Sequence, residues 1–360
     1  MSRRHQHRDG DWDSVARRLD EIISAHSGED TFEEAFKLLV GKLAAEQLDG
    51  AARFLGEAGE HAARFDALLG RADNAWPGAL EDTRTKLAET ELARCAEVLA
   101  PLRLSDDGLV GLDAIFEFIS TKAAKGQKGQ FFTPRYVIDE VVQMVGIEAG
   151  ETVLDPACGS GGFLRHALTH QPACSVHGVD LDPRAARVAR VMLAASGVPC
   201  ERVRRDDSLQ RGGDARFDVI LTNPPFAGDV GEEFRARYEL AQTNKKAERD
   251  VLFLERCVEL LHPGGRLAMV LPHNKLGSGA WAFVREWLLR RMQVQAVVGL
   301  GRNTFMPHTS IKACVLFATK REAVLEGPGK PAEEIFFFVS ERDGKDTGGR
   351  LQLDAAGAVD

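Results

Sequence analysis

Two sharp turns constrain this chain most, because each one directly follows a short, largely apolar run. The first turn, residues 155–163 (DPACGSGGF), comes after residues 152–154, and the second, residues 223–226 (NPPF), comes after residues 217–221. Short apolar runs that end at turns rich in Gly or Pro are typical of buried strands. Ligands of open α/β sheets bind at the carboxyl ends of the strands. We therefore expect both turns to open onto the same crevice.

Strand and helix patterns alternate along the chain from about residue 131 onward. The expected strands are residues 152–154, 175–179, 217–221, 267–271, 294–298 and 314–317, with a short apolar run at 335–339. Helical patterns cover residues 136–145, 183–196, 251–261 and 281–291. Alternation of this kind predicts an α/β fold, in which helices cover both faces of a mainly parallel sheet.

The first 125 residues have helical patterns instead. Residues 31–34 (TFEE) have the form of a capping box, in which a Thr hydroxyl and a Glu carboxylate satisfy backbone N–H groups at a helix start. An apolar stripe at helical spacing follows, and residues 80–99 and 110–119 are further helix candidates. Residues 122–129 are rich in Lys and Gly, which indicates a linker before the α/β part.

Composition and cysteine usage exclude several classes of protein. Of the 360 residues, 44% are hydrophobic and 28% are charged, as in ordinary soluble globular proteins. No apolar run approaches the ~18 residues of a membrane span, and the N-terminus lacks the apolar core of a secretion signal. The six cysteines have no CxxC spacing, which predicts neither a zinc site nor a disulfide framework and fits a reducing cytoplasm.

The chain is acidic, with a formal net charge of −8 at pH 7 and an isoelectric point near 5.8. Proteins that bind nucleic acid on their own usually carry a basic surface. If DNA is the substrate, a basic patch or a basic partner must therefore offset this acidity.

Three motifs stand in order along the chain: residues 129–135 (GQFFTPR), 155–163 and 223–226. In this order they resemble the N6-adenine DNA methyltransferases, and more closely the modification subunit of type I restriction-modification systems. The resemblance covers about residues 111–320. It implies a class I S-adenosylmethionine-dependent methyltransferase fold, which is Rossmann-like, after a helical N-terminal domain. We predict a helical domain at 1–125, a catalytic domain at 126–320, and a connector, short strand and polar tail at 321–360.

Side chains around the first turn suit a cofactor that carries an amino group and a ribose. Asp155, at the tip of its strand, can hold the amino group by charge-assisted hydrogen bonding. The glycines of the turn let the backbone approach a cofactor closely. Asp180, at the end of the next strand, can accept ribose hydroxyls, and Asp182 is interpreted as the N-cap of the following helix.

The resemblance adds further cofactor contacts. Asp207 would meet the adenine amino group, although a solvated loop carboxylate is a near-equal alternative. Residues 130–135 would fold over the cofactor, with backbone groups near Thr133 touching its methionine part; the alternative is a plain helix start at Pro134. The predicted cofactor-binding residues are Gln130, Phe131, Phe132, Thr133, Pro134, Arg135, Asp155, Ala157, Gly159, Ser160, Gly161, Gly162, Phe163, Asp180 and Asp207.

The second turn carries the predicted chemistry. The exocyclic nitrogen of adenine is a poor nucleophile, because its lone pair is delocalised into the ring. The Asn223 side-chain oxygen and the Pro224 carbonyl can accept its two N–H groups and aim the lone pair at a methyl group, so positioning supplies much of the rate. Phe226 is suited to stack on a base that has left the helix. The predicted catalytic residues are Asn223, Pro224, Pro225 and Phe226, and no metal is expected.

These observations predict a cytoplasmic enzyme that transfers a methyl group from S-adenosylmethionine to the N6 amino group of adenine in DNA. Nothing after the catalytic region is long enough for a target-recognition domain, so a separate specificity subunit is expected. A restriction subunit is a further candidate partner, and no membrane association is expected.

Alternative functions remain open on the sequence. The same fold acts on cytosine N4, on RNA bases or on protein glutamine, and a non-catalytic scaffold of a defence complex is a further alternative. A Pro199–Cys200 pair would suit cytosine C5 chemistry, but it lies well ahead of Asn223 and is interpreted as accidental.

Overall fold

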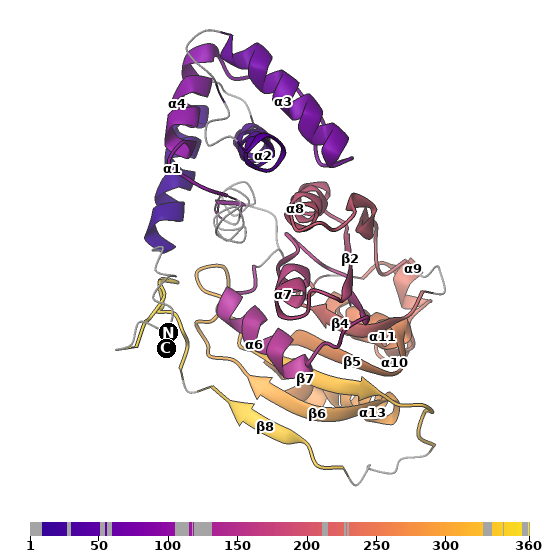
Figure 1. Ribbon diagram of the computed structural model, residues 1–360. Helices are drawn as coiled ribbons and strands as arrows, with labels where there is room; N and C mark the ends of the chain where they lie inside the picture. Colours follow the sequence, from indigo (N-terminus) through magenta and orange to yellow (C-terminus); the bar gives the residue numbers. More distant parts are fainter. Residues whose placement is uncertain are drawn as a thin grey trace. The chain divides into compact units, whose positions relative to one another are not determined.

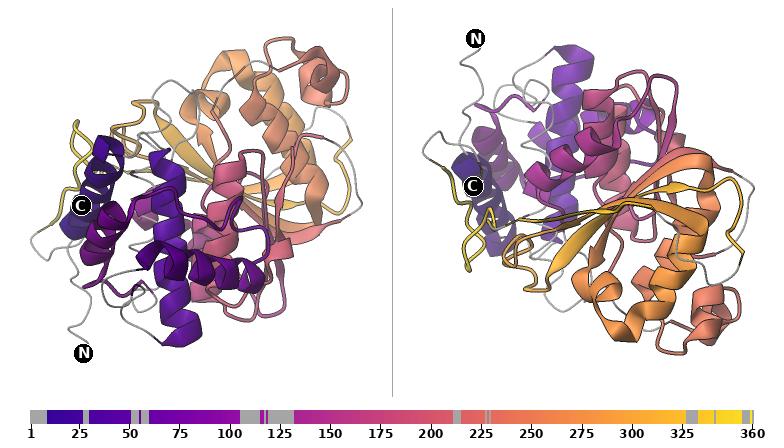
Figure 2. Two further views of the ribbon diagram at one scale, coloured as in Figure 1. Left: turned by 90° about the horizontal axis from the view of Figure 1, so that it is seen from above. Right: turned by 90° about the horizontal axis from the view of Figure 1, so that it is seen from below.

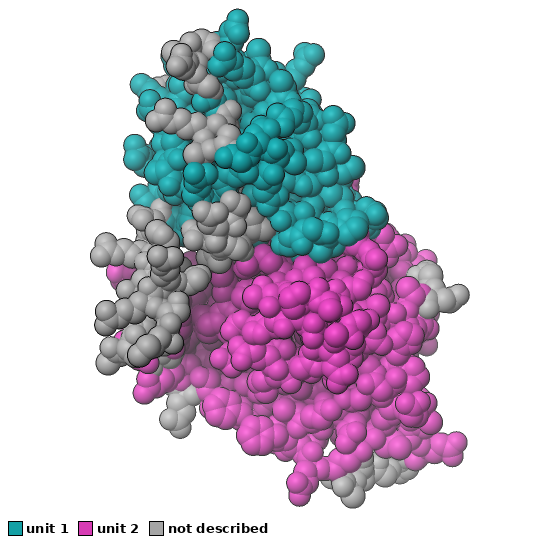
Figure 3. Space-filling view, in the orientation of Figure 1, with its two compact units in different colours: residues 1–128, 190–201 teal, residues 129–189, 202–360 magenta. Residues whose placement is uncertain are grey.

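The computed structural model describes residues 9–26, 30–50, 55, 60–104, 115, 116, 118, 132–210, 215–226, 228, 230–326, 333–340, 342–354 and 359. The chain divides into two compact units, shown in different colours in Figure 3. The first comprises residues 1–128 and 190–201, and the second comprises residues 129–189 and 202–360.

The first unit is helical. Its helices are α1 (Asp9–His26), α2 (Thr31–Asp49), α3 (His61–Ala75) and α4 (Glu89–Leu99) (Figure 1). Most residues of α2 are buried, so this helix forms the centre of the unit. Ring centroids lie 5.8 Å apart for Phe32 and Phe36, and 5.1 Å apart for Phe36 and Phe116. The helical N-terminal region expected from the sequence is therefore present.

The start of α2 differs from the predicted capping box at Thr31 and Glu34. Asp30 is the N-cap, because its Oδ1 accepts a hydrogen bond from the backbone N–H of Phe32 at 2.9 Å. Glu34 is buried instead and forms an ion pair with Lys37 at 3.0 Å. The prediction was wrong because a carboxylate one residue upstream already satisfies the free N–H groups of the first turn.

Helix extent also differs from the prediction over residues 80–99, of which only residues 89–99 are helical. Buried side chains of α2 hold the earlier part in a non-helical form. Glu34 accepts a hydrogen bond from the backbone N–H of Lys86 at 3.1 Å, and Lys37 donates to the carbonyl of Arg84 at 2.6 Å. Local periodicity does not contain these long-range contacts.

Other predictions for this region fall mostly outside the described residues. Of the predicted helix at 110–119, the structure describes residues 115, 116 and 118, and all three are helical. The predicted linker at 122–129 lies outside the described residues entirely. The sequence patterns did not predict α1 or α3.

The second unit is built on an eight-stranded sheet. Its strands are β1 (Thr152–Asp155), β2 (Ser175–Asp180), β3 (Val203–Arg205), β4 (Phe217–Thr222), β5 (Leu261–Pro272), β6 (Met292–Gly299), β7 (Ala313–Lys320) and β8 (Phe336–Val339). They lie in the order β3-β2-β1-β4-β5-β7-β6-β8. β7 is antiparallel to both of its neighbours, and the other pairs are parallel. The prediction of a mainly parallel sheet is confirmed.

Helices cover both faces of this sheet, as the view from below in Figure 2 shows. The remaining helices are α6 (Arg135–Val145), α7 (Gly162–His170), α8 (Pro183–Ala194), α9 (Glu232–Arg235), α10 (Glu239–Thr243), α11 (Arg249–Leu260), α12 (His273–Gly277) and α13 (Ala282–Arg291), with short 3₁₀ turns at Cys200–Arg202 and Gly279–Trp281. α8 and the first of these turns span the boundary between the two units. α6 and α7 lie on one face, and α11 and α13 lie on the other. Among the described residues, no helix is long and apolar enough to cross a membrane.

The direction of chain progression reverses at β1, which pairs with β2 on one side and with β4 on the other. Open α/β sheets bind ligands at such a switch point, outside the carboxyl ends of the strands. The turns at residues 155–163 and 223–226 follow β1 and β4, so both lie at this point. This arrangement is the one expected from the two turns.

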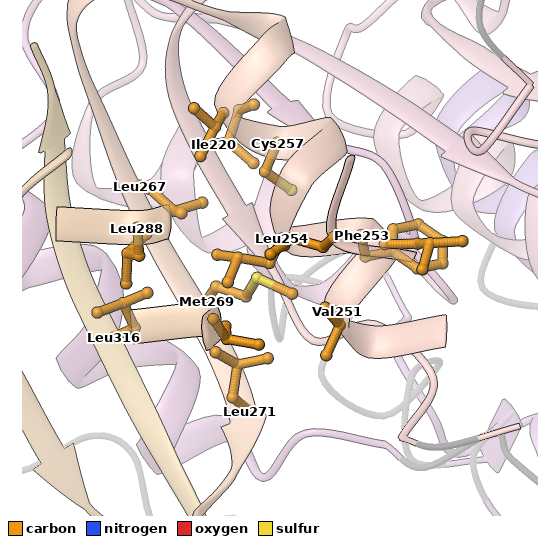
Figure 4. Close-up of a cluster of buried hydrophobic side chains, with 14 of the residues drawn as sticks. Ile220, Val251, Phe253, Leu254, Cys257, Leu267, Met269, Leu271, Leu288 and Leu316 are labelled. Carbon is orange, nitrogen blue, oxygen red and sulfur yellow. The ribbon is translucent and has the colours of Figure 1, made fainter. Parts of the chain in front are cut away.

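A packed core holds the second turn in place. Figure 4 shows the side chains of Ile220 on β4 and of Leu267 and Met269 on β5 beside Leu254 and Cys257 of α11. All five side chains are at most 1% exposed. Because interiors are close-packed, the position of β4, and hence of the turn that follows it, is closely defined.

Candidate active site

The glycine-rich turn needs glycine at two backbone positions. Gly159 has φ 53° and Gly161 has φ 87°, both in the left-handed region that residues with a Cβ rarely adopt. Gly161 is the N-cap residue of α7, and its N–H donates to the carbonyl of Cys158 at 2.8 Å. At the start of α7, a Cβ on Gly162 would lie 3.0 Å from Ile138 Cδ1, so this helix packs tightly on α6. Phe163 is buried.

Asp155 lies beneath the turn and is 2% exposed. Its Oδ1 accepts hydrogen bonds from Thr222 Oγ1 at 2.7 Å and from the backbone N–H of Ala157 at 3.0 Å. Burial raises the pKa of Asp155 to about 7, against the lowering effect of these two hydrogen bonds. Asp155 therefore ties the end of β1 to the end of β4, and Thr222 is a contributor that the sequence did not reveal.

Asp180 supports the same turn from the end of β2. Its Oδ2 accepts from the backbone N–H of Gly159 and its Oδ1 from that of Asp182, both at 2.8 Å. Burial raises the pKa of the Asp180 carboxyl. Asp182 in turn accepts from the N–H of Arg184 at 2.7 Å and of Ala185 at 3.2 Å, which confirms it as the N-cap of α8.

A pocket of about 110 Å³ lies beside these residues and reaches the second turn. Ala157 and Pro225 place both turns on its wall, and Asp180 and Asp207 line it with carboxylates. Asp207 is half-buried and accepts from the backbone N–H of Leu209 at 3.0 Å. The apolar part of the wall includes Leu181, Leu209, Val230, Phe234 and Phe253.

Asn223 has one satisfied and one unsatisfied side-chain atom. Its Nδ2 donates a hydrogen bond to Thr133 Oγ1 at 2.8 Å. Its Oδ1 is buried and accepts no hydrogen bond from any residue that the structure describes. Pro224, the next residue, is buried. The turn therefore presents a fixed acceptor, and buried acceptors without a donor are rare in folded proteins.

Phe226 packs on the ring of Phe305, a residue to which the sequence assigned no role. Its ring lies 5.9 Å from that of Phe305, at an interplanar angle of 77°, and the two residues are 7% and 1% exposed. Edge-to-face pairs of this kind add to the stability gained by burial. Phe305 lies far along the chain in the loop between β6 and β7, and no local signal links it to the NPPF turn.

The first motif is described from Phe132 onward, so Gln130 and Phe131 lie outside the described residues. Pro134 is the N-cap residue of α6 and Arg135 is its first residue, as the plain helix start predicts. Thr133 nevertheless contacts Asn223, so the motif also reaches the second turn.

The described cysteines do not provide an activated nucleophile. All six are buried. Burial raises the pKa of Cys95 and of Cys314 to about 12, and it also raises the pKa of Cys174, Cys200 and Cys257. Because the thiolate is the reactive form, these shifts disfavour cysteine-based chemistry such as cytosine C5 methylation.

The sequence of this chain matches a known protein family. Residues 111–353 match the family described as N-6 DNA Methylase, and this match covers more than half of the chain. The chain belongs to the N-6 DNA methylase family. The family resemblance predicted from the three motifs is therefore confirmed.

Relatives of this N-6 DNA methylase include subunits of restriction enzymes. The chain is 31% identical over 233 residues to the type I restriction enzyme EcoEI methylase subunit of Escherichia coli, over 59% of this chain and 45% of the relative. It is 28% identical over 211 residues to the type II methyltransferase M.CvrRI of Paramecium bursaria Chlorella virus XZ-6E, over 56% of this chain and 51% of the relative. The chain thus spans about half the length of these relatives.

Solved structures support the fold class. A modification subunit of a putative type I restriction enzyme from Vibrio vulnificus YJ016 superimposes with a TM-score of 0.67 at 20% identity, covering 100% of this chain and 89% of that one. A putative class I S-adenosylmethionine-dependent methyltransferase from Listeria monocytogenes gives a TM-score of 0.58 at 18% identity, covering 88% of this chain and 95% of that one. The predicted class I methyltransferase fold is confirmed.

Proposed function

We propose that this chain transfers a methyl group from S-adenosylmethionine to the N6 amino group of adenine in DNA. The buried Oδ1 of Asn223 carries the proposal, because no described residue donates to it. A buried acceptor without a hydrogen-bond donor destabilises the folded protein, and a ligand that supplies the donor removes this penalty. The amino group of adenine is such a donor, and membership of the N-6 DNA methylase family supports this substrate.

Asn223 and Pro224 are assigned to orient the amino group. Asn223 Oδ1 and the Pro224 carbonyl accept its two N–H groups, which turns the nitrogen lone pair toward the methyl donor. Thr133 keeps the amide in the required orientation, because its Oγ1 accepts from Nδ2 and leaves Oδ1 for the substrate. Positioning of this kind lowers the barrier without a strong base.

The pocket beside the two turns fits the adenosyl part of the cofactor in chemical character. S-adenosylmethionine, when bound, supplies an electrophilic methyl group. Asp180 can accept ribose hydroxyls and Asp207 an adenine amino group, between apolar walls. The volume of about 110 Å³ is below the ~300 Å³ of typical ligand pockets, so we assign the methionine part to the surface over Gly159 and Gly161.

Phe226 and Pro225 are assigned to hold the target base once it has left the helix. Extrusion costs a few kcal/mol, which stacking and hydrogen bonding in the pocket must offset. Phe305 supports Phe226 from one side and so fixes the angle of its ring.

We further propose that the chain acts as the modification subunit of a restriction-modification system, with a separate specificity subunit and a restriction subunit as partners. The relatives named as type I methylase subunits support this assignment. The net charge of −8 also supports a partner that supplies much of the DNA contact. We also propose that the catalytic domain is bounded at residues 125 and 320.

The test is incorporation of labelled methyl groups into genomic DNA, RNA and cell protein, with and without co-purified partners. We expect N6-methyladenine in DNA, and only when a specificity partner is present. Label in RNA, in protein or on cytosine N4 would transfer the function to one of those substrates. Tight cofactor binding with no label in any of them would favour a non-catalytic scaffold.

Two substitutions separate chemistry from cofactor binding. Asn223→Ala should retain affinity for S-adenosylmethionine, measured by calorimetry, and lose turnover. Asp155→Ala should weaken cofactor binding itself, because it releases the turn that Asp155 ties to Thr222. Normal methylation by Asn223→Ala would show that the proposed chemistry is wrong.

A further inference from the structure

Three side chains that can ligate a metal ion lie close together on α6 and α7, and none of them belongs to the proposed active site. His166 and His170 are four residues apart on α7, so both lie on one side of that helix. Asp139 projects from α6 toward them. Asp139 Oδ1 lies 2.7 Å from His170 Nε2 and 3.4 Å from His166 Nδ1, and the three ligand atoms all lie within 4.8 Å of one another.

This donor set has the composition and spacing of a zinc site. Zn²⁺ binds imidazole nitrogen and carboxylate oxygen at about 2.0–2.2 Å in tetrahedral geometry, so its ligand atoms lie about 3.4 Å apart. The separations from Asp139 Oδ1 to the two imidazole nitrogens are 2.7 and 3.4 Å, and the distance between the two imidazole nitrogens is at most 4.8 Å. Small side-chain rotations are therefore sufficient to place three protein ligands around one ion.

Neighbouring groups already orient the carboxylate. Gln143 Nε2 donates to Asp139 Oδ2 at 2.9 Å, which leaves Oδ1 directed at the two imidazoles. Partners of this kind fix ligand geometry in metal sites. His166 Nε2 lies 3.3 Å from Arg165 Nη2, so metal binding through Nδ1 would place a hydrogen on Nε2 and displace that contact.

Solvent can reach the site. The side chains of His166, His170 and Asp139 are 14%, 31% and 41% exposed. A water molecule can therefore complete the tetrahedron as the fourth ligand.

We propose that Asp139, His166 and His170 bind a first-row divalent metal ion, Zn²⁺ foremost, as a clip between α6 and α7. α6 begins directly after Thr133, and α7 begins directly after the glycine-rich turn. The ion would thus join the two helices that carry the proposed cofactor contacts. Its role is structural, and its binding is independent of the proposed methyl transfer.

The cysteine spacing predicted no zinc site, because that pattern concerns cysteine ligands only. No sequence motif links Asp139 to His166 and His170, which lie 27 and 31 residues away. The packing of α6 on α7 alone brings them together.

Calorimetry with Zn²⁺ on the full, untagged chain tests the proposal. His5 and His7 near the N-terminus are a competing metal-binding pair, so the reference protein carries His5→Ala and His7→Ala. We expect one Zn²⁺ per chain and a higher thermal midpoint on binding. Co²⁺ in the same site should show the visible absorption of a tetrahedral complex.

In that reference protein, Asp139→Asn and His170→Gln should each weaken Zn²⁺ binding by about tenfold or more. His262→Gln, at an exposed position on β5, is the matched control and should leave the affinity unchanged. Absence of stoichiometric Zn²⁺ binding by the reference protein would overturn the proposal. This outcome does not depend on whether the variants fold. Equal affinity of Asp139→Asn and the control would also overturn it.

Discussion

At the residue scale, the chemistry proposed for the site depends on which atom of the Asn223 side-chain amide already has a hydrogen-bond partner. Nδ2 of Asn223 is satisfied by Thr133, and its buried Oδ1 has no donor among the described residues. An amide held at one end by a hydroxyl acts as an oriented acceptor, which is what positioning of a weak nucleophile requires. Thr133 is therefore a positioning residue for Asn223.

Thr133→Val should lower kcat by about tenfold, which corresponds to about 1.4 kcal/mol, the free energy of one positioning hydrogen bond. Val has a similar shape but no acceptor, so the Asn223 amide can rotate. Cofactor affinity should change little, because only backbone near Thr133 is predicted to touch the cofactor. Single-turnover methylation measures the effect, and Thr133→Ser is the control that should restore the rate. Equal rates for the Val and Ser variants would contradict the role.

Asp155 makes stability depend on pH. Its pKa is raised to about 7 in the folded state from an ordinary value of 3.8, so the unfolded chain ionises it first. The free energy of unfolding therefore falls as pH rises from about 4 to about 7. Asp155→Asn removes this penalty, so its urea midpoint relative to the wild type should rise between pH 5 and pH 8.

Asp218→Asn is the matched control for this measurement. Hydrogen bonds from Thr152, first its backbone N–H and then its hydroxyl, lower the pKa of Asp218. Ionisation of Asp218 thus favours the folded state, and this contribution is complete above about pH 4, so the effect of Asp218→Asn should stay constant between pH 5 and pH 8. A difference between Asp155→Asn and the wild type that stays constant with pH would contradict the inferred protonation.

At the element scale, the segment after β8 braces the loop that supports Phe226. The Asp343 carboxylate accepts hydrogen bonds from Asn303 N at 3.2 Å and Asn303 Nδ2 at 2.7 Å. The Asp343 carbonyl accepts from the hydroxyl of Tyr136, in the first turn of α6, at 3.3 Å. Two elements that flank the NPPF turn thus share one partner, although this segment was predicted only as part of a connector and polar tail.

Asp343→Ala should loosen the loop that carries Phe305 and lower kcat several-fold, with cofactor affinity preserved. The expected loss of about 1–2 kcal/mol corresponds to one charge-assisted hydrogen-bond partner. Asp346→Ala is the control, because Asp346 accepts hydrogen bonds from Gly348 and Arg350 within its own turn. Steady-state kinetics with DNA and calorimetry with the cofactor separate the two effects. Equal kcat for both variants would remove Asp343 from the active-site support.

At the scale of the whole molecule, an acidic chain belongs to a family that modifies DNA. The net charge is −8, and the chain spans about half the length of its relatives. Phosphate contacts dominate the affinity of proteins for DNA and make it salt-dependent. The chain by itself therefore lacks the overall charge that non-specific DNA binding uses.

Alone at physiological salt, the chain should bind duplex DNA with a Kd of about 10 µM or weaker, in the range of non-specific binding. Fluorescence anisotropy with a labelled duplex over a series of salt concentrations measures this affinity. Addition of a specificity subunit should tighten binding and confine it to one sequence. Sub-micromolar binding by the isolated chain would contradict the need for a partner.

Local patterns along the sequence predicted most of the strands, the helices α6, α8, α11 and α13, and the two turns at the carboxyl ends of β1 and β4. These features depend on local patterns, because a short apolar run and the turn residues after it specify a buried strand and its end. The family also followed from three ordered motifs. The capping box at Thr31 failed at the same local level, because Asp30 was the stronger cap.

Which side chains meet depends on contacts between distant segments of the chain. Asn223 and Thr133 are 90 residues apart, Phe226 packs on Phe305 of a later loop, and β7 inserts antiparallel between β5 and β6. The free energy of such contacts comes from burial and hydrogen bonding between distant segments. A local sequence pattern does not include such long-range contacts. The unsatisfied Asn223 oxygen and the proposed metal clip therefore become visible only in the folded chain.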